Sequence, residues 1–494
     1  MKKTALIFMV ISFCALINAP HLKADAKPEL VWGKHIGTTE SDDVIGVAAD
    51  NAGGIFAVGS TSGVFGETHF GKSDALICKL NSEGEFVWKQ QLGTPEDDNG
   101  RAVVCDAENN CYIAGITKGD LGSENAGRED AFLAKYDPQG NLLWVRQIGT
   151  NGNERGGAVT VDDNGNVYLA GSTTKSLAGT AAGSYDAFVA KYSPEGEQYW
   201  VAQYGTTKKE EVYGIAVDKD GNSYVTGDTD FVFKFDSNGS FLWSWNLTSH
   251  FFRDIDIDNL GSIYLAGVRS SNSSAVMLKL DDATQKPVWQ KYFYSTWCTY
   301  KGLTVTKDGT GEVVGAGCQG PGCQAFARRY DKDGNLVWEQ DKIGRDGDSC
   351  GFDVAMDKNG NYYEVGGTAG DLFIANLGNG DGFIYKLGST NPSGLNEPNP
   401  LPKEIKLNQN FPNPFNSSSE ITYSIPKNSF VNLSIYNITG QKVRSLINNL
   451  QESGEHKAVW DGTDDFGTGM SSGIYFYELA LPDQRMIKKM ILVQ

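Results

Sequence analysis

Short apolar runs alternate with Gly- and Asn-containing turns along most of the chain. Units contain runs like "GAVTV" (157–161), "NVYLAG" (166–171) and "AFVAKY" (187–192), and a last run that carries tryptophan, like "NLLWVRQ" (141–147). Turns such as "DDNGN" (162–166) supply residues that tolerate positive φ. The pattern predicts units of four short antiparallel strands, with a variable loop between the second and third strands.

The units repeat along the chain. The phrase "DAFLAKYDPQGNLLWVRQIGT" at 130–150 returns as "DAFVAKYSPEGEQYWVAQYGT" at 186–206. A tryptophan marks the end of the phrase at Trp32, Trp88, Trp144, Trp200, Trp243, Trp289 and Trp338. Units of this size with four antiparallel strands are typical of propeller blades. The first strands are small, as in "GVAAD", and the last ones carry tryptophan, which suits a wedge that is narrow at the axis.

The last unit is incomplete, and the start of the chain supplies what it lacks. Its third run begins at Asp381, and the place of the fourth run is taken by a stretch rich in Pro, Asn and Ser. The segment "PELVWGKHIG" (28–37) has the pattern of a fourth strand without a unit of its own. Pairing the two would hide both edges. We therefore predict an all-β fold, a seven-bladed β-propeller over residues 27–388 closed by the N-terminal strand.

The units resemble a known family, the SBBP (seven-bladed β-propeller) repeat. The resemblance lies in "VDDNGNVYLAGST" (161–173) and "DAFVAKYSPEGEQYW" (186–200), and it is strongest in the first four units. It implies a fold and no particular reaction.

A second domain follows a linker. Residues 389–406, "GSTNPSGLNEPNPLPKEI", have the composition of a linker. Residues 407–494 contain short strand patterns such as "VNLSIYN" and "GIYFYELAL", which predict a small β-sandwich.

This second domain resembles the C-terminal sorting domain of type IX secretion, which has a FlgD-like immunoglobulin fold. The residues that carry the resemblance are Phe411, Pro412, Asn413, Pro414, Phe415, Asn416, Trp460, Asp461, Gly462, Lys488 and Lys489. The chain departs from many relatives by ending in Gln494 rather than in a basic residue. The resemblance implies that the outer-membrane secretion machinery is a partner.

The first residues have the features of a signal peptide. Lys2 and Lys3 precede an apolar stretch at 5–17, and Ala24–Ala26 offers an A-x-A cleavage site. We predict a signal peptide over residues 1–26. The mature chain is then expected outside the cell or on its outer surface, after export through the periplasm.

The cysteines that follow the predicted signal peptide are expected in an oxidising compartment, where disulfides form. Cys105 and Cys111 flank a hairpin turn and are placed to face each other. The residues predicted to form disulfides are Cys105, Cys111, Cys298, Cys318, Cys323 and Cys350, with Cys78 left over. The spacing leaves the pairing of the last four open.

Charge and motifs exclude several classes of function. The net charge of −18 argues against nucleic acid, because phosphate binding requires a basic face. "GETHFGKS" (66–73) has the letters of a P-loop but precedes a strand rather than a helix. The Asp-rich turns lack the closing glutamate and flanking helices of an EF-hand. No catalytic motif is present, and we expect a protein that is not an enzyme and needs no cofactor or metal.

Acidic loops between units, with nearby aromatic residues, mark one face of the predicted propeller. The predicted binding residues are Glu40, Asp42, Asp43, Glu96, Asp97, Asp98, Glu210, Glu211, Phe251, Phe252, Trp297, Tyr300, Asp346 and Asp348. Carboxylates beside aromatic rings suit sugar binding, or sugar cleavage where two carboxyls converge. The plainer alternative is a solvated acidic rim.

These observations favour a secreted or cell-surface module that recognises a glycan or a protein without catalysis. An extracellular polysaccharide hydrolase or lyase is one alternative, and a structural surface module is another.

Overall fold

The computed structural model describes two compact units, Met1–Asn391 and Pro392–Gln494, each considered by itself. The described residues are 27–294, 298–307, 310–320, 324–341, 349–370, 372–373, 377–378, 380–388, 405–410, 412–416, 418–426, 429–451, 454–465, 467–482 and 484–493. The secondary structure of these residues is all strand, as predicted. They form no helix with the length and hydropathy needed to cross a bilayer. The predicted signal peptide and most of the predicted linker lie outside them.

Within the described residues, the first unit contains seven four-stranded antiparallel sheets. The first four are formed by β2 (Asp42–Ala49), β3 (Ile55–Thr61), β4 (Asp74–Leu80), β5 (Phe86–Leu92); β6 (Asp98–Cys105), β7 (Cys111–Thr117), β8 (Asp130–Tyr136), β9 (Leu142–Ile148); β10 (Glu154–Val161), β11 (Val167–Thr173), β12 (Asp186–Tyr192), β13 (Gln198–Tyr204); and β14 (Val212–Val217), β15 (Ser223–Gly227), β16 (Phe231–Phe235), β17 (Phe241–Asn246).

The other three sheets include the two ends of the unit. They are formed by β18 (His250–Ile257), β19 (Ile263–Arg269), β20 (Ser274–Asp281), β21 (Lys286–Phe293); β22 (Thr299–Val305), β23 (Val313–Gln319), β24 (Gln324–Tyr330), β25 (Leu336–Asp341); and β26 (Ser349–Met356), β27 (Tyr362–Thr368), β28 (Asp381–Gly388) with β1 (Glu29–Ile36). The strand predicted at 28–37 is therefore present as β1, antiparallel to β28. Beside this pairing, His35 Nδ1 lies 2.9 Å from Asp381 Oδ2, and both side chains are buried.

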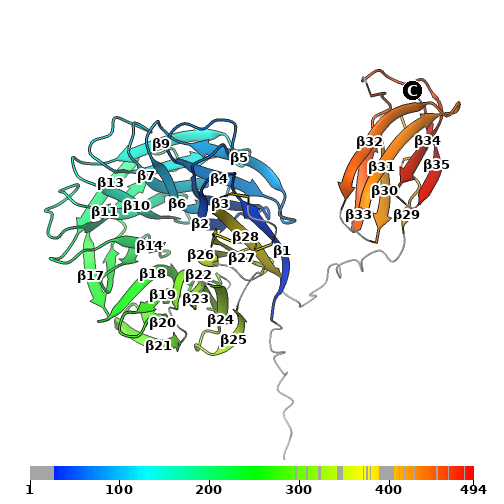
Figure 1. Cartoon of the computed structure of the whole chain (residues 1–494). Helices are drawn as coiled ribbons and strands as arrows, with labels where there is room; N and C mark the ends of the chain where they lie inside the picture. The colour runs from blue at the N-terminus through cyan, green and yellow to red at the C-terminus, as the bar shows by residue number, and fades with distance from the viewer. Residues whose placement is uncertain are drawn as a thin grey trace, which may run out of the picture. The chain divides into compact units, whose positions relative to one another are not determined.

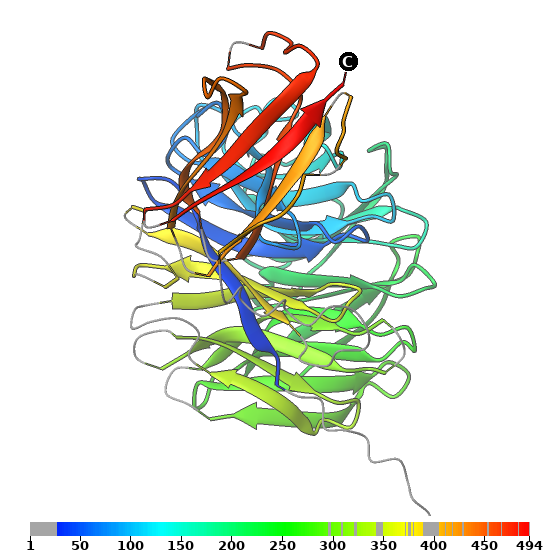
Figure 2. The ribbon, with the colours of Figure 1, turned by 90° about the vertical axis from the view of Figure 1, so that its right-hand side faces the viewer.

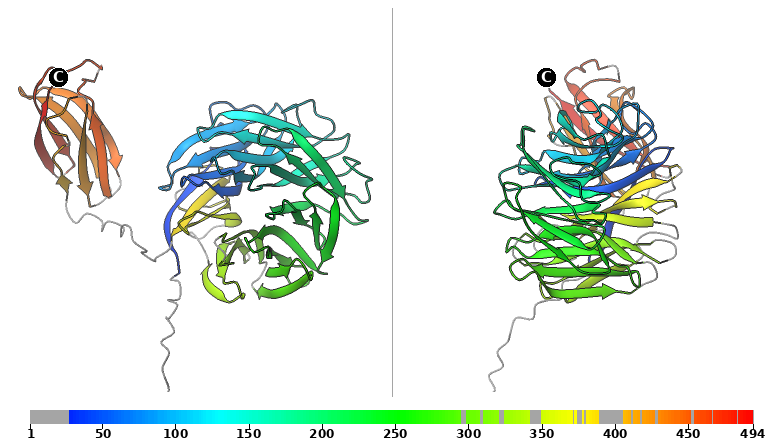
Figure 3. Two further views of the ribbon diagram at one scale, coloured as in Figure 1. Left: turned by 180° about the vertical axis from the view of Figure 1, so that it is seen from behind. Right: turned by 90° about the vertical axis from the view of Figure 1, so that its left-hand side faces the viewer.

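The sheets have a propeller-like arrangement around a common axis (Figure 1). The innermost strands β2, β6, β10, β14, β18, β22 and β26 pack against one another in this order, and β26 also packs against β2. Views from the side and from behind show consecutive sheets as neighbours (Figure 2, Figure 3). Strands such as β4 and β8 are buried along their whole length, because a sheet lies on each side of them.

A repeated contact joins neighbouring sheets at their outer strands. The Trp88 indole Nε1 donates to the carbonyl of Pro138 at 3.1 Å, across to the next sheet. The same ring covers Gly140, where φ is +87° and an added Cβ would lie 2.8 Å from the indole. Trp32, Trp144, Trp200 and Trp289 make the equivalent hydrogen bond and cover the equivalent glycine.

The Asp-rich turns are hairpins. Asp162 Oδ1 accepts hydrogen bonds from the backbone N–H groups of Asn164 and Asn166, at 3.0 and 2.9 Å. Its Oδ2 accepts from the Tyr168 hydroxyl at 3.1 Å. The aspartate therefore organises the β10–β11 turn, as the hairpin interpretation predicts.

The second unit contains two sheets around one core. Its strands are β29 (Lys406–Leu407), β30 (Ser419–Ile425), β31 (Ser429–Asn437), β32 (Lys442–Gln451), β33 (Gly454–Trp460), β34 (Gly473–Ala480) and β35 (Arg485–Leu492). One sheet has the order β29-β30-β33 and the other β32-β31-β34-β35. Leu433, Trp460 and Tyr477 are fully buried in the core between them.

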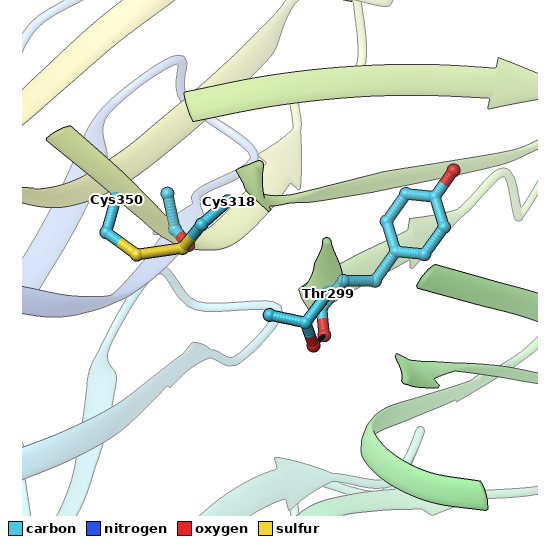
Figure 4. The surroundings of a disulfide bond; sticks show 5 residues. Thr299, Cys318 and Cys350 are labelled. Carbon is cyan, nitrogen blue, oxygen red and sulfur yellow. Dashed lines mark hydrogen bonds between the residues drawn. A yellow bond between two sulfur atoms is a disulfide. The ribbon is translucent and has the colours of Figure 1, made fainter. Parts of the chain in front are cut away.

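One disulfide joins Cys318 in β23 to Cys350 in β26, two neighbouring sheets of the first unit (Figure 4). Cys105 and Cys111 lie opposite each other in β6 and β7, as expected, but the prediction of a bond between them is wrong. Both thiols lie in or against an apolar cluster, and burial raises the pKa of each well above its usual value. The reactive thiolate is therefore disfavoured.

The remaining cysteines differ in their surroundings. Cys78 is buried without a disulfide, and burial raises the pKa of its thiol to about 12. Cys298 is buried as well, and Cys323 lies outside the described residues.

We predict that replacing Cys318 and Cys350 together by alanine lowers the free energy of unfolding by about 3 to 4 kcal/mol, because the bond closes a loop with a sequence separation of 32 residues. Urea titration measures the loss. A reductant should lower the midpoint of the parent chain and leave that of the double variant unchanged. Equal midpoints for parent and variant under oxidising conditions would contradict this.

Candidate functional site

The candidate site is built by a β-bulge that recurs in each of the seven innermost strands. The pairing register shifts between Val44 and Gly46 in β2, and the other six strands shift at the equivalent step. A bulge leaves one residue outside the ladder and turns its side chain away from the partner strand. These seven residues, called the axial ring below, are Ile45, Arg101, Gly157, Tyr213, Arg253, Lys301 and Phe352.

All members of the axial ring are accessible to solvent. Arg101 is exposed, and the other six are partly exposed. The residue before each of them is buried, from Val44 in β2 to Gly351 in β26. The bulge therefore presents one accessible residue per sheet near the axis, on strands whose neighbouring positions pack inside.

Four ring members contact one another in pairs across neighbouring sheets. The Arg253 guanidinium lies 4.4 Å from the Tyr213 ring centroid, and the Lys301 ammonium lies 4.2 Å from the Phe352 ring centroid. Asp228 accepts a hydrogen bond from the Tyr213 hydroxyl at 3.2 Å and lies 3.3 Å from Arg253 Nη1. Burial and the Asp228 charge raise the pKa of Tyr213. These contacts fix the direction of both cations.

Two carboxylates follow the ring positions directly in sequence. Asp254 Oδ2 accepts from the N–H of Leu303 at 2.8 Å, and Asp353 Oδ2 accepts from the N–H of Val47 at 2.9 Å. In each case the donor is the next innermost strand, so the carboxylate joins two sheets. Gly302 provides space for this, since a Cβ there would lie 2.6 Å from the Asp353 Cα.

Burial raises the pKa of both carboxyls. For Asp254 the raised pKa has a second cause, the charge of Asp353. Burial raises the pKa of Asp353 to about 7. A third group, the buried Glu364, also has a raised pKa because of burial, and it accepts a hydrogen bond from the Tyr385 hydroxyl.

Several predicted binding residues are buried, which corrects the expectation for them. Asp42, Asp98 and Glu210 are 6%, 0% and 1% exposed, and each accepts hydrogen bonds from the backbone N–H and hydroxyl of a threonine four residues earlier. Phe252 and Tyr300 are fully buried between sheets. All five lie at positions of the innermost strands or their leading loops that face a neighbouring sheet.

The other predicted binding residues are in contact with solvent or lie outside the described residues. Those in contact with solvent are Glu40, Asp43, Glu96, Asp97, Glu211 and Phe251, and those outside are Trp297, Asp346 and Asp348. Glu96 forms an ion pair with Lys72 at 2.6 Å, and Glu211 forms one with Arg155 at 3.1 Å. Among the described residues, no three His, Cys, Asp or Glu side chains are arranged to hold a metal.

A hollow lies away from the axis, between the outer strands of the first two sheets. It has a volume of about 600 Å³, and Phe70, Gln90, Leu121, Asn141 and Leu142 are among its lining residues. Phe70 and Leu142 are each 45% exposed.

In the second unit, the motif residues hold the last strand in place. The Phe415 N–H donates to the Ile491 carbonyl at 3.0 Å, and Asn413 Oδ1 accepts from the Ile491 N–H at 2.9 Å. The Phe415 ring lies 5.5 Å from the buried Trp460. The exposed motif residues are Pro412, Asn413, Pro414, Asn416, Asp461 and Lys489, with Lys488 partly exposed and Gly462 buried. Phe411 lies outside the described residues.

Comparison with protein families supports the repeat and the second unit. Residues 143–177 and 200–234 match the SBBP model, described as a beta-propeller repeat. Residues 415–482 match the FlgD Ig-like domain.

Two curated proteins are similar to part of the chain. An uncharacterized WD repeat-containing protein of Acanthamoeba polyphaga mimivirus is 24% identical over 193 residues, 30% of this chain and 14% of that protein. The regulatory protein FlaEY of Caulobacter vibrioides is 22% identical over 188 residues, 35% of this chain and 20% of that protein. The similarity thus spans a small part of each relative.

Two solved structures align with part of the chain at low identity. A protein of unknown function from Bacteroides caccae has a TM-score of 0.40 at 14% identity and covers 54% of this chain and 90% of its own. Raptor from Chaetomium thermophilum has a TM-score of 0.47 at 11% identity and covers 74% of this chain and 29% of its own.

We predict that stability falls as the pH rises toward 7, in part because of Asp353. Its pKa is raised from 3.8 to about 7, so the folded state binds more protons than the unfolded state between these values. For one proton that the folded state binds in excess of the unfolded state, the free energy of unfolding falls by up to about 1.4 kcal/mol when the pH rises by one unit.

The Asp353→Asn variant should therefore show a smaller decrease over pH 4 to 7, measured by urea unfolding at each pH. The partly exposed Asp281, whose pKa is lowered by hydrogen bonds from Thr284, offers a control. The Asp281→Asn variant should keep the slope of the parent. A parent-like slope in Asp353→Asn would refute the assignment.

Proposed function

We propose that the protein is a non-catalytic recognition module whose ligand binds at the axial ring. The observation that carries this proposal is the recurring bulge, which presents one accessible residue from each innermost strand near the axis. The residues at this position differ from sheet to sheet, whereas the positions beside it are mostly small or apolar. A binding surface that fits one ligand is expected to have different residues at equivalent positions of otherwise similar strands.

We also propose that the seven sheets are seven blades of a closed propeller. The pairing of β1 with β28 supports this, because it gives the last sheet the fourth strand that the sequence places at the chain start. The packing of β2 against both β6 and β26 is the arrangement that a closed ring requires.

The ligand class that the ring suits is a glycan or a protein segment. Aromatic faces and cations are both common at sites that bind sugars and peptides. A polysaccharide hydrolase or lyase is the second candidate, favoured by the neighbouring raised-pKa carboxyls of Asp254 and Asp353. Each carboxylate already accepts two backbone hydrogen bonds, from Leu303 and Ile255 or from Val47 and Val354. This geometry favours a structural role.

The proposed route to the outside combines both ends of the chain. We propose a signal peptide at 1–26, a linker at 389–406, and a type IX sorting domain at 407–494 that takes the chain to the outer surface or the medium. The FlgD Ig-like match and the hydrogen bonds of Asn413 and Phe415 to Ile491 support a folded domain around the motif.

Removing residues 405–494 should leave the chain in the periplasm of a Gram-negative cell that carries type IX machinery. Fractionation and surface protease digestion measure this. Lys488→Ala with Lys489→Ala tests the role of these two lysines of β35, and Lys442→Ala, at an exposed position of β32, is the control. Surface display of the truncated chain at the parent level would refute the sorting role.

A glycan array, with analysis of the bound sugars afterwards, tests the recognition role of the purified protein. Tyr213→Ala should weaken binding of any ligand found by about 10-fold, since the ring loses an aromatic face. Tyr199→Ala is the matched control, because Tyr199 is 55% exposed on the outer strand β13. Cleaved sugar would favour the hydrolase, and binding unaffected by Tyr213→Ala would place the ligand elsewhere.

A further inference from the structure

We propose that the hollow between the outer strands β5 and β9, called the outer hollow below, is a second binding site that takes an uncharged sugar residue of a glycan (Figure 1). The site is separate from the axial ring, so this inference goes beyond the proposed function and does not rest on it. The volume of about 600 Å³ lies within the range of roughly 300 to 1,000 Å³ that is usual for small-molecule sites. The lining residues come from the loop before β4, from β5, from the loop before β8, and from β8, β9 and the turn between them.

Phe70 is an aromatic residue at a position where the fold requires no large side chain. Its backbone N–H donates to Asp74 Oδ2 at 2.7 Å, just before β4. Ala126, Ala182 and Leu377 make the equivalent hydrogen bond in the second, third and seventh sheets, at 2.6 to 2.9 Å. Alanine therefore suffices for this contact, whereas Phe70 adds a side chain that is 45% exposed at the outer hollow. A flat aromatic face can pack against the apolar face of a pyranose ring.

Tyr136 brings a buried hydroxyl without a partner to the same hollow. The residue is 2% exposed, and its hydroxyl forms no hydrogen bond with the residues that the structure describes. In the next sheet, the equivalent Tyr192 hydroxyl donates to Gln198 Oε1 at 3.4 Å. Leu142 stands opposite Tyr136 at the place of Gln198, and its side chain has no acceptor.

A bound sugar would supply the partner that Tyr136 lacks. Burial raises the pKa of Tyr136 above its usual value, so the hydroxyl stays protonated and can donate. Buried hydroxyls in proteins are nearly always paired, because an unpaired one has lost its hydrogen bonds to water. A sugar hydroxyl or ring oxygen in the outer hollow can accept this hydrogen bond.

Gln90 is shorter than the residue at its place in the next sheet. Gln90 Nε2 donates to the Gly140 carbonyl at 3.1 Å, and Arg146 Nε donates to the equivalent Gly196 carbonyl at 2.7 Å. The longer Arg146 side chain also lies over the Trp144 ring, at 5.3 Å from the centroid. Gln90 Oε1 accepts no hydrogen bond from the described part of the chain, so it is available to a ligand hydroxyl.

The exposed polar residues of the outer hollow offer further acceptors. Asp120 uses Oδ1 for the N–H of Asn125, at 2.8 Å, which leaves Oδ2. Asn141 uses Nδ2 for a hydrogen bond to Asp137, at 2.7 Å, which leaves Oδ1. The lining residues include no lysine, arginine or histidine. Oxygen acceptors suit the hydroxyl donors of a sugar, a purely apolar ligand would leave them unpaired, and the Asp120 carboxylate disfavours an acid.

Saturation-transfer NMR of the full chain with cellotriose, maltotriose and tri-N-acetylchitotriose tests the inference, because the method detects weak binding. We expect at least one of these uncharged trisaccharides to bind with a Kd below about 10 mM. Trigalacturonate, which carries a carboxylate on every ring, should bind more weakly than that trisaccharide because of Asp120. No binding of any uncharged trisaccharide up to this concentration, or tighter binding of the acid, would overturn the inference.

A matched pair of variants locates the site. Phe70→Ala should weaken binding of the trisaccharide about 10-fold, because the aromatic face is lost. Leu377→Ala removes a side chain that is 44% exposed at the equivalent position of the seventh sheet, and it should keep the affinity of the parent. Ala126 and Ala182 indicate that alanine is compatible with the fold at this position, and thermal unfolding of each variant checks this.

Two further variants fill the outer hollow or satisfy its hydroxyl. Gln90→Arg introduces the residue found at the equivalent position of the next sheet and should abolish binding by occupying the space. Leu142→Gln gives the Tyr136 hydroxyl the acceptor that Tyr192 has, and it should weaken binding about 3-fold. Unchanged affinity in folded Gln90→Arg would overturn the assignment to this hollow.

The failures of the two proposals are distinguishable. Binding that Phe70→Ala weakens and Tyr213→Ala leaves unchanged would support the outer hollow, whatever binds at the axial ring. Binding that Tyr213→Ala abolishes and Phe70→Ala leaves unchanged would overturn this inference and retain the proposed function. Binding that neither variant affects would overturn both assignments.

Discussion

The contact between a tryptophan of one outer strand and a turn glycine of the next sheet is the constraint on which the repeat depends. A blade-like sheet cannot bury its faces alone, so each unit needs a neighbour at a fixed position. Trp88 fixes it with a hydrogen bond to the Pro138 carbonyl and by covering Gly140. A side chain at Gly140 would clash with the indole of Trp88. It would also be strained by the backbone conformation, because φ is +87° at this position. Tryptophan and glycine therefore recur together in the sequence because they belong to one interface.

This constraint explains why the strands and their order could be predicted from the sequence. Four apolar runs, turns such as the one organised by Asp162, and the recurring tryptophan are all requirements of packing between sheets, and each leaves a periodic trace. The N-terminal strand β1 could be predicted in the same way. Its sequence matches the fourth strand that the last unit lacks, so β28 of that unit is the expected partner.

The same reasoning explains why the predicted binding residues were partly wrong. Asp42, Asp98 and Glu210 recur at one position of the units, and their prediction as binding residues rested on the acidity of these loops and on nearby aromatic residues. Recurrence instead reflects a shared structural task, because each of the three organises the loop that leads into an innermost strand. Cys105 and Cys111 were placed correctly in register, yet register alone does not tell whether the two sulfur atoms are bonded.

The axial ring was missed because a bulge adds a residue that no periodic pattern reveals. A usable signal was present, in that Tyr213, Arg253 and Lys301 occupy a position that varies strongly between flanking residues that repeat. Residues on either side of the bulge are mostly buried between neighbouring sheets, whereas the bulged residue is exposed or partly exposed. Its identity can change with little effect on the pairing of the strands, so the seven bulged positions carry different residues. The Trp–Gly contacts at the outer strands therefore fix how the sheets pack, while the bulged positions of the innermost strands remain variable.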